Sequence, residues 1–236
     1  MTHTLARRLA AEFVGAMLLL SAVVGSGIMA ERLAGGNLAL ALLCNTIATG
    51  TALVALILTF GPISGAHLNP AVTVADAISG GFAWRHVPAY IAVQIAGAFA
   101  GVVAAHFMFG LPVLSVSNHV RSGPSQVLSE FVATFGLLAV IWGCSRTRST
   151  AVPFAVGAYI TAAYWFTAST SFANPAVTLA RALTNTFTGI RAADVLPFIA
   201  AQFVGALTAT FLFQWLMPVL KEEHAVVLVR STQTDD

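Results

Sequence analysis

The hydrophobic residues of this chain are grouped in six long stretches that are separated by shorter, more polar segments. A hydrocarbon core about 30 Å thick requires roughly 20 consecutive apolar residues in a helix, and each stretch is close to that length. The pattern therefore predicts an all-α membrane protein with six transmembrane helices. Their approximate bounds are 9–29, 38–60, 87–109, 127–145, 152–169 and 195–218.

Two further apolar segments, about 69–79 and 174–187, are too short to cross a bilayer. Each follows a predicted span and a loop rich in small or polar residues, at 61–67 and 169–173. Irregular backbone at membrane depth is tolerated only where protein buries it or where it lines a wet cavity. We therefore expect two re-entrant segments, in which a loop dips into the membrane and a half-helix leads back out.

The second half of the chain repeats the plan of the first. Glu12 opens the first span within Ala-Glu-Phe-Val, and Glu130 opens the fourth within Ser-Glu-Phe-Val. Because each half has three spans, an odd number, the second half is inverted relative to the first, and such repeats place the permeation site near the midplane. The predicted organisation is a first repeat over 1–120, an inverted second repeat over 121–220 and a cytoplasmic tail over 221–236.

Both short segments begin with an Asn-Pro-Ala motif, and these residue types are typical of the first turn of a helix. Asn is a good N-cap and Pro is favoured at the next position. With its oxygen used in capping, each Asn amide is left to donate into the space that the loop faces. Two helix N-termini, each with about half a positive charge, then meet at the membrane centre, which predicts a filter for polar, uncharged solutes that disfavours cations. The two copies are Asn69-Pro70-Ala71 and Asn174-Pro175-Ala176.

Composition supports a membrane location. Of the 236 residues, 58% are hydrophobic and only 8% are charged, whereas a soluble domain has about a quarter charged residues. The first apolar run is too long for the hydrophobic region of a signal peptide and is followed by further spans, so we expect no cleaved leader. The net charge of +2 is small and scattered, and it does not indicate a nucleic-acid partner.

Basic residues near the span ends indicate the orientation in the membrane. If the six spans alternate in direction, most of these residues fall on one side. That side is predicted to be cytoplasmic, with both termini on it, in an inner (plasma) membrane of bacterial type. The larger group is Arg7, Arg8, Arg85, Arg146, Arg148, Lys221 and Arg230, and the smaller group is Arg32, Arg121 and Arg191.

These residues resemble the aquaporin, or major intrinsic protein, family. The segment 64–73, Ser-Gly-Ala-His-Leu-Asn-Pro-Ala-Val-Thr, is similar to the first family signature, and the second Asn-Pro-Ala to the second. The resemblance extends from about Glu12 to Pro218. It implies six full helices plus two half-helices, a pore in every subunit and a homotetramer in lipid, with no enzymatic activity and no cofactor.

The residue after the second Asn-Pro-Ala departs from the family pattern. Most members have an Arg there, and this chain has Val177. By spacing from the two Asn residues, the other three positions of the family's outer constriction correspond to Thr49, Ala162 and Ser171. All four side chains are small and uncharged. Loss of a guanidinium removes a positive barrier and fixed donors for hydroxyl groups, so we expect a wide outer filter.

A wide filter predicts passage of solutes larger than water, such as glycerol-like polyols and neutral metalloid hydroxides, including uncharged arsenite. The pattern resembles bacterial aquaglyceroporin-like channels associated with arsenic handling, some of which lack the Arg. A water-selective channel is the alternative within the family. An inverted-repeat secondary transporter would need coupling-ion ligands or a proton relay near the midplane, and the polar groups there are mostly amides and hydroxyls. A membrane-embedded enzyme is disfavoured because no metal-ligand cluster or nucleophile–base pair occurs within the spans.

Arg181 complicates the expected filter. It lies four residues after Val177, on the same face of the predicted half-helix. Helical side chains lean toward the N-terminus, so its guanidinium could reach back and restore a positive vestibule. Alternatively, it extends to the outer interface or pairs with a neighbour. Its counterpart in the first repeat, Asp76, is expected near the cytoplasmic surface.

Two carboxylates and one histidine complete the candidate residues. Glu12 and Glu130 lie inside apolar spans at matching repeat positions, where an intramembrane carboxylate suggests a function. The family resemblance implies that they brace the loop backbone beside each half-helix, and a proton relay is the alternative. His67, two residues before the first Asn, either lines the cytoplasmic half of the pore or braces the loop through hydrogen bonds.

Overall fold

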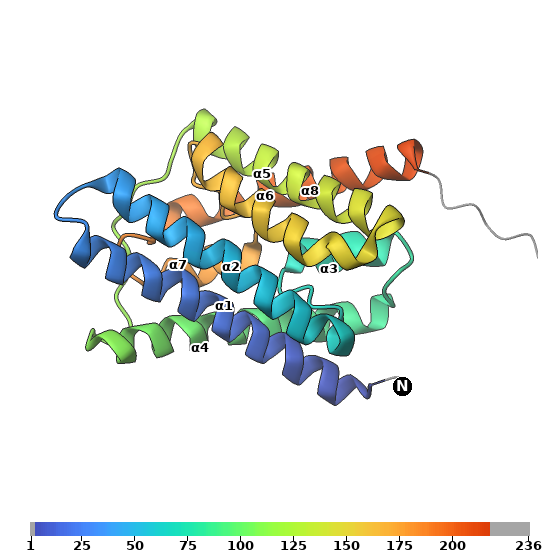
Figure 1. Ribbon diagram of the computed structural model, residues 1–236, viewed down its shortest axis with the longest axis horizontal. Coiled ribbons are helices and arrows are strands. Elements are labelled where there is room, and N and C mark those ends of the chain that lie inside the picture. The colour runs from blue at the N-terminus through green and yellow to red at the C-terminus, as the bar shows by residue number, and fades with distance from the viewer. Residues whose placement is uncertain (1–2, 218–236) are drawn as a thin grey trace, which may run out of the picture.

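The computed structural model describes residues 3–217, and within that range every regular element is helical. The long helices run alongside one another, and both described ends of the chain lie at the same end of the molecule (Figure 1). We call that end the terminal side and the opposite end the distal side. The predicted tail, 221–236, lies outside the described residues, as does Pro218. The helices are α1 (Leu5–Leu33), α2 (Leu38–Ser64), α3 (Pro70–Ile78), α4 (Val87–Phe109), α5 (Pro124–Thr147), α6 (Val152–Phe166), α7 (Pro175–Arg181) and α8 (Ala192–Leu216), with 3-10 turns η1 (Trp84–His86) and η2 (Ser149–Ala151).

Five helices, α1, α2, α4, α5 and α8, are long and apolar enough to cross a membrane. The sixth predicted span, 152–169, is helical only as far as Phe166, and the 15 residues of α6 are about 22 Å long at 1.5 Å per residue. The helix ends because Thr167 is extended, with φ −108° and ψ 137°. Thr170 and Ser171 then have positive φ, so the chain cannot continue as a helix.

The two half-helices lie between the long helices and run in opposite directions from the middle of the molecule. Helix α3 closely matches the predicted segment 69–79. Helix α7 ends at Arg181, so the prediction of a half-helix up to 187 is wrong. The chain folds back after α7, and Ile190 N donates to Arg181 O at 3.2 Å. Thr184 Oγ1, which the predicted helix would have included, instead lies 2.8 Å from His106 Nε2.

The two halves have the same internal packing in inverted orientation. In the first half α1 packs along α2 and α4, and in the second α5 packs along α6 and α8. Helices α2 and α6 pack across the halves, and α3 and α7 contact each other and both α4 and α8 (Figure 1). This is the inverted repeat of an all-α membrane protein that the sequence predicts. The junction proposed between residues 120 and 121 falls in the connection from α4 to α5.

Glycines at equivalent positions of the two halves permit close helix contacts. Gly97 in α4 faces the backbone of Phe13 in α1, and Gly205 in α8 faces the backbone of Phe131 in α5. A Cβ atom at either glycine would collide with the carbonyl oxygen opposite. Small residues let helices approach in lipid, where packing drives their association.

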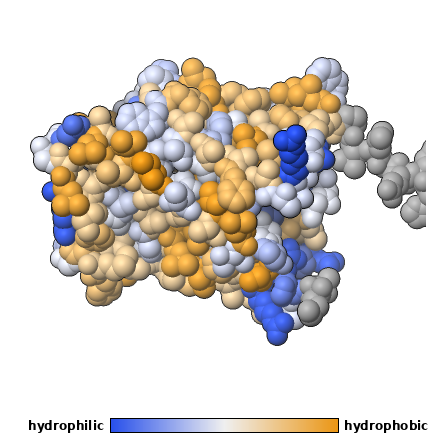
Figure 2. Space-filling view, in the orientation of Figure 1, coloured by the Kyte–Doolittle hydropathy of each residue, from blue (hydrophilic) through white to orange (hydrophobic). Residues whose placement is uncertain are grey.

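The exterior and interior have the polarity expected of a protein surrounded by lipid. Large apolar side chains cover the flanks, and hydrophilic residues gather toward the two ends (Figure 2). Several polar side chains also lie in the interior of the helix bundle. Glu12, Glu130, Gln94 and Gln202 are fully buried there. The exposed apolar side chains include Leu38, Ile47, Phe107, Trp165, Phe211 and Trp215.

Candidate functional site

Both half-helices begin with the predicted Asn cap. Asn69 Oδ1 accepts a hydrogen bond from Ala71 N at 2.9 Å. Asn174 Oδ1 accepts from Ala176 N at 3.0 Å and from Val177 N at 3.3 Å. A proline follows each Asn as the first helical residue. The motif therefore orients both helix N-termini toward the middle of the molecule, as its composition predicts.

The two Asn side chains also link the re-entrant loops to each other. Asn69 Nδ2 donates to Ala173 O at 2.8 Å, and Asn174 Nδ2 donates to Leu68 O at 2.8 Å. Each amide nitrogen carries two hydrogens, so one is used in this link and the second remains for the cavity that both residues line. The sequence predicts the donors but not the reciprocal link, because the partners are about a hundred residues apart.

Both loops contain residues in unfavourable backbone conformations. Leu68 and Ala173, whose carbonyls accept the Asn amides, have φ of 48° and 49°. Ala66 and Ser171 also have positive φ. Such conformations in non-Gly residues cost of order 1–3 kcal/mol each and persist only where the surroundings enforce them.

Glu12 holds the first loop in place. Its carboxylate accepts hydrogen bonds from His67 N at 3.0 Å, Leu68 N at 2.7 Å and Ser64 Oγ at 2.7 Å. Gln94 Nε2 donates to the same carboxylate at 2.8 Å. These contacts are those that the bracing role predicts.

Glu130 makes the equivalent contacts in the second repeat. It accepts hydrogen bonds from Phe172 N and Ala173 N, both at 2.9 Å, and from Gln202 Nε2 at 2.6 Å. Gln202 also donates to Thr178 Oγ1 in α7 at 2.8 Å. All of these partners are N–H donors, so none of them could accept a proton from the carboxylate and pass it onward.

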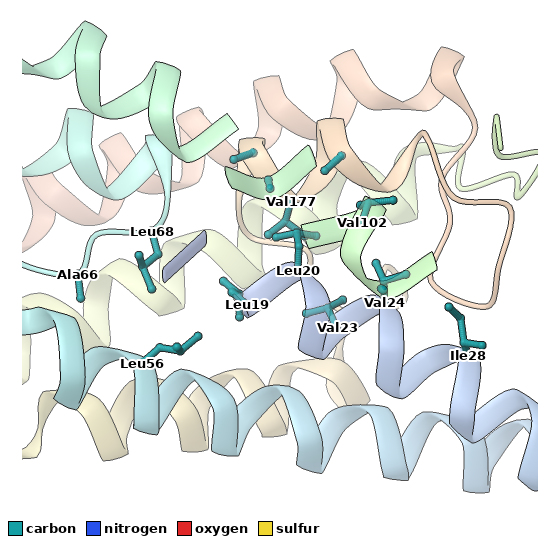
Figure 3. Close-up of a cluster of buried hydrophobic side chains, with 14 residues drawn as sticks. Leu19, Leu20, Val23, Val24, Ile28, Leu56, Ala66, Leu68, Val102 and Val177 are labelled. Atoms are coloured by element: carbon teal, nitrogen blue, oxygen red, sulfur yellow. The ribbon is translucent and has the colours of Figure 1, made fainter. Parts of the chain in front are cut away.

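A cavity of about 350 Å³ runs between the halves and past both Asn side chains. One side is apolar, and Figure 3 shows Leu19, Leu68 and Val177 projecting from α1 and from the two re-entrant segments into one cluster. The other side is formed by the loops at 65–69 and 171–174. The arrangement can accept a small solute that has both carbon and oxygen surfaces.

Toward the distal side the cavity is lined by Thr49, Ser171 and Val177, three of the four residues expected in the outer filter. The fourth expectation, Ala162, is wrong: it is exposed and lies outside the lining that the described residues form. Tyr164 takes that place, since the buried face of α6 includes Val156, Ile160 and Tyr164, with one turn between successive residues. Tyr164 Oη donates to Thr49 Oγ1 at 3.3 Å.

Arg181 turns back toward the cavity and does not extend to the interface. Its side chain is only 2% exposed and lines the cavity. The guanidinium carbon lies 3.4 Å from the centroid of the Phe172 ring, and Nε donates to Thr188 O. Of the two interpretations of this residue, the geometry matches the one in which it reaches the pore mouth.

Arg121 is a partly buried residue near the site that the sequence does not single out. It lies between α4 and α5, and its Nε donates to Gly189 O at 2.8 Å and its Nη1 to Ser169 O at 3.2 Å. Its backbone N donates to an Asp194 carboxylate oxygen at 2.8 Å. Loss of hydration lowers the pKa of this guanidinium. All of these partners are distant along the chain, so no local pattern marks Arg121 as a site residue. In the sequence it is only one of the basic residues expected on the outer side.

His67 and Asp76 form the terminal-side mouth of the cavity. His67 Nε2 lies 3.3 Å from an Asp76 carboxylate oxygen, and Nδ1 lies 3.2 Å from Thr73 Oγ1. The imidazole packs against the rings of Phe82 and Tyr90. His67 therefore both lines the cavity and makes bracing contacts. Across residues 3–217 no cluster of three His, Cys, Asp or Glu side chains is arranged to bind a metal ion.

Comparison with known proteins identifies the family. The family described as major intrinsic protein matches residues 1–170 and, in a second overlapping match, residues 144–235. The chain belongs to this family. It is similar to Aquaglyceroporin AqpS of Rhizobium meliloti (strain 1021), with 54% identity over 92% of this chain and 95% of that relative. It is 32% identical to Aquaporin NIP1-3 of Oryza sativa subsp. japonica, over 97% of this chain and 81% of that protein.

The fold agrees with the membership in the major intrinsic protein family. The X-ray structure of the aquaglyceroporin from Plasmodium falciparum superimposes with a TM-score of 0.71 and 22% identity, covering 91% of this chain and 98% of that one. The chain is therefore an integral membrane protein with the aquaporin fold. Members of this family are passive channels for water and small solutes and are not enzymes.

Proposed function

We propose that the chain is a passive channel for small uncharged solutes, including water, glycerol-like polyols and neutral metalloid hydroxides such as arsenite. The observation that carries the proposal is the two-sided lining of the cavity. Its apolar wall includes Val23, Ile57 and Ile160, and the opposite wall is made by the two re-entrant loops. A polyol also has an apolar and a polar side. Its carbon chain can contact the apolar wall while its hydroxyl groups form hydrogen bonds with the loops.

The bracing glutamates support this proposal by orienting the loop peptides. The N–H groups of His67, Leu68, Phe172 and Ala173 point to Glu12 or Glu130. In a trans peptide the carbonyl points opposite to the N–H, so the carbonyls of the preceding residues face away from the glutamates and toward the cavity. These acceptors and the two Asn amides supply a line of hydrogen-bonding groups in place of a solute's hydration shell.

A water-selective channel remains the second candidate, and Tyr164 favours it. An aromatic side chain in place of the expected Ala162 narrows the distal filter formed by Thr49, Ser171 and Val177. Two observations favour the wider solute range: position 177 carries no guanidinium, and the similar AqpS of Rhizobium meliloti is an aquaglyceroporin by name.

In this proposal the protein forms a homotetramer in the inner membrane of a bacterium, with the terminal side in the cytoplasm. The orientation rests on the excess of basic residues near the terminal ends of the spans. The rhizobial relative supports a bacterial membrane, and the tetramer rests on the family resemblance.

The test compares water, glycerol and arsenite permeability of proteoliposomes by stopped-flow light scattering, for the wild type, Val177→Arg and Val177→Leu. We expect the wild type to pass all three solutes. Val177→Arg should lose glycerol and arsenite flux while water flux persists, because a second guanidinium narrows the filter. The Val177→Leu variant controls for added bulk without charge. A wild type that passes water alone would favour the water-selective alternative.

A further inference from the structure

We infer that Arg181 supplies the fixed cation of the distal filter and that Arg121 is the residue that positions it, through the loop that carries Phe172 and through the backbone beside Thr188. The inference rests on the proposed channel function and goes beyond it by naming the residues that separate cations from neutral solutes. Position 177, directly after the second Asn-Pro-Ala, is a valine. The charge therefore comes from the next turn of α7.

The contacts of Arg181 fix its guanidinium, and among the described residues they use only one of its N–H donors. A guanidinium has five N–H donors, and Nε uses one on Thr188 O. The planar group lies against the Phe172 ring, which itself packs edge-on against Phe198 with ring centroids 5.3 Å apart. Within residues 3–217 the close contacts between a basic side chain and a carboxylate are His67–Asp76 and Arg191–Asp194, so no described carboxylate pairs with Arg181.

Arg121 contacts the two parts of the chain that fix Arg181, which are the segment at Thr188 and the loop that carries Phe172. Its guanidinium carbon lies 5.0 Å from the centroid of the same Phe172 ring. Its bond to Gly189 O fixes the residue next to Thr188, and its bond to Ser169 O fixes the loop that carries Phe172. Arg121 is thus a positioning residue: it acts on the filter through the backbone on both sides of Arg181.

A neighbouring side chain indicates that the site is built to bind a polar group. Ser171 Oγ is buried and has no hydrogen-bond partner among the described residues, and Ser171 and Arg181 line the same cavity. A buried hydroxyl without a partner is costly, and a passing solute hydroxyl would satisfy it. The ligand class is therefore a neutral solute with hydroxyl oxygens, which accepts from Arg181 and pairs with Ser171.

The electrostatic consequence is a barrier to cations at the distal side. A charge away from bulk water interacts strongly with an ion a few ångströms away, because the effective dielectric constant is lower than in water. The half-helix N-termini oppose cations at the centre, and Arg181 adds a second barrier nearer the mouth. Removing the Arg181 charge should therefore admit cations without closing the path for neutral solutes.

The experiment measures the ratio of cation flux to glycerol flux in proteoliposomes, using an entrapped pH dye for protons, a potassium gradient for K⁺ and light scattering for glycerol. Arg181→Met should raise this ratio by roughly tenfold or more, and Arg181→Lys, which keeps the charge, should keep the ratio near that of the wild type. Arg32→Met is the matched control, since it removes an exposed distal-side arginine that does not line the cavity. It should leave the ratio unchanged.

The role of Arg121 is tested with the same ratio. Arg121→Gln should raise the ratio and Arg121→Lys should restore it in part, whereas a purely structural loss would lower all fluxes together. If Arg181→Met does not fold, Val177→Glu places a carboxylate one turn from Arg181, where it can pair with the guanidinium. Val177→Glu should then raise the ratio relative to Val177→Gln.

The outcomes separate the two proposals. A wild type that passes neither water nor glycerol would overturn the channel proposal and this inference with it. A wild type that passes solutes, together with an unchanged ratio in Arg181→Met, or in Val177→Glu if Arg181→Met does not fold, would overturn the inference alone.

Discussion

At the scale of single residues, Glu12 and Glu130 determine the geometry of the re-entrant loops. Each is fully buried, and each accepts two backbone N–H groups from a loop with positive φ angles. Such a carboxylate is costly to bury alone, and the hydrogen bonds to it offset that cost. These hydrogen bonds hold both loops in conformations that their non-glycine residues would otherwise rarely adopt.

The first prediction concerns this bracing. Glu130→Gln should lower the free energy of unfolding by about 2–4 kcal/mol, because charge-assisted bonds are lost and the new amide NH₂ faces donors. Thermal unfolding of the purified protein in detergent would show a lower Tm. Glu31→Gln is the control, since Glu31 is exposed and, among the described residues, accepts only from Phe187 N at 3.2 Å. Equal Tm values for both variants would contradict the bracing role.

A second prediction separates the two candidates for the α6 position in the filter. Tyr164→Ala should increase glycerol permeability severalfold because the ring lines the distal cavity. Ala162→Leu should leave it unchanged because that side chain is exposed. The measurement is stopped-flow glycerol flux, normalised to the amount of protein in the vesicles. Unchanged glycerol flux in Tyr164→Ala together with altered flux in Ala162→Leu would indicate that Ala162, not Tyr164, lines the filter.

At the scale of elements, the half-helix starts follow from local sequence and the half-helix ends do not. Capping by Asn and the preference for Pro act within one turn, so Asn69 and Asn174 predict both starts. The end of α7 at Arg181 depends on the chain folding back onto it, which the apolar and polar pattern up to residue 187 does not reveal. The α6 residue that lines the cavity is likewise set by packing against α2 and α5, which counting back from Asn174 does not reveal.

The helix contacts yield a third prediction. Gly97→Val should destabilise the protein by about 1–3 kcal/mol or more, because the side chain would collide with the backbone of Phe13 and force α1 and α4 apart. Gly61→Val in α2 is the matched control, since open space surrounds that position. The Tm of both variants in detergent is the measurement. A Tm of Gly97→Val no lower than that of Gly61→Val would contradict this account of the packing.

At the scale of the whole molecule, most of the architecture could be predicted from the sequence. Hydropathy predicts the spans, the odd number of spans per half predicts the inversion, and the paired Asn-Pro-Ala motif predicts the two half-helix starts at the centre. The remainder of the site could not be predicted, because it consists of contacts between distant segments. The Asn69–Ala173 link and the contacts of Arg121 with Ser169 and Gly189 leave no local signal in the chain.

The central claim is that neutral solutes pass through a continuous polar path without coupling to an ion. The most direct measurement is stopped-flow glycerol flux into wild-type proteoliposomes over a wide range of glycerol concentration, with no Na⁺ or H⁺ gradient. The account predicts flux that rises in proportion to the gradient and does not saturate. Flux that saturates or that requires an ion gradient would contradict it and would indicate a transporter with the same fold.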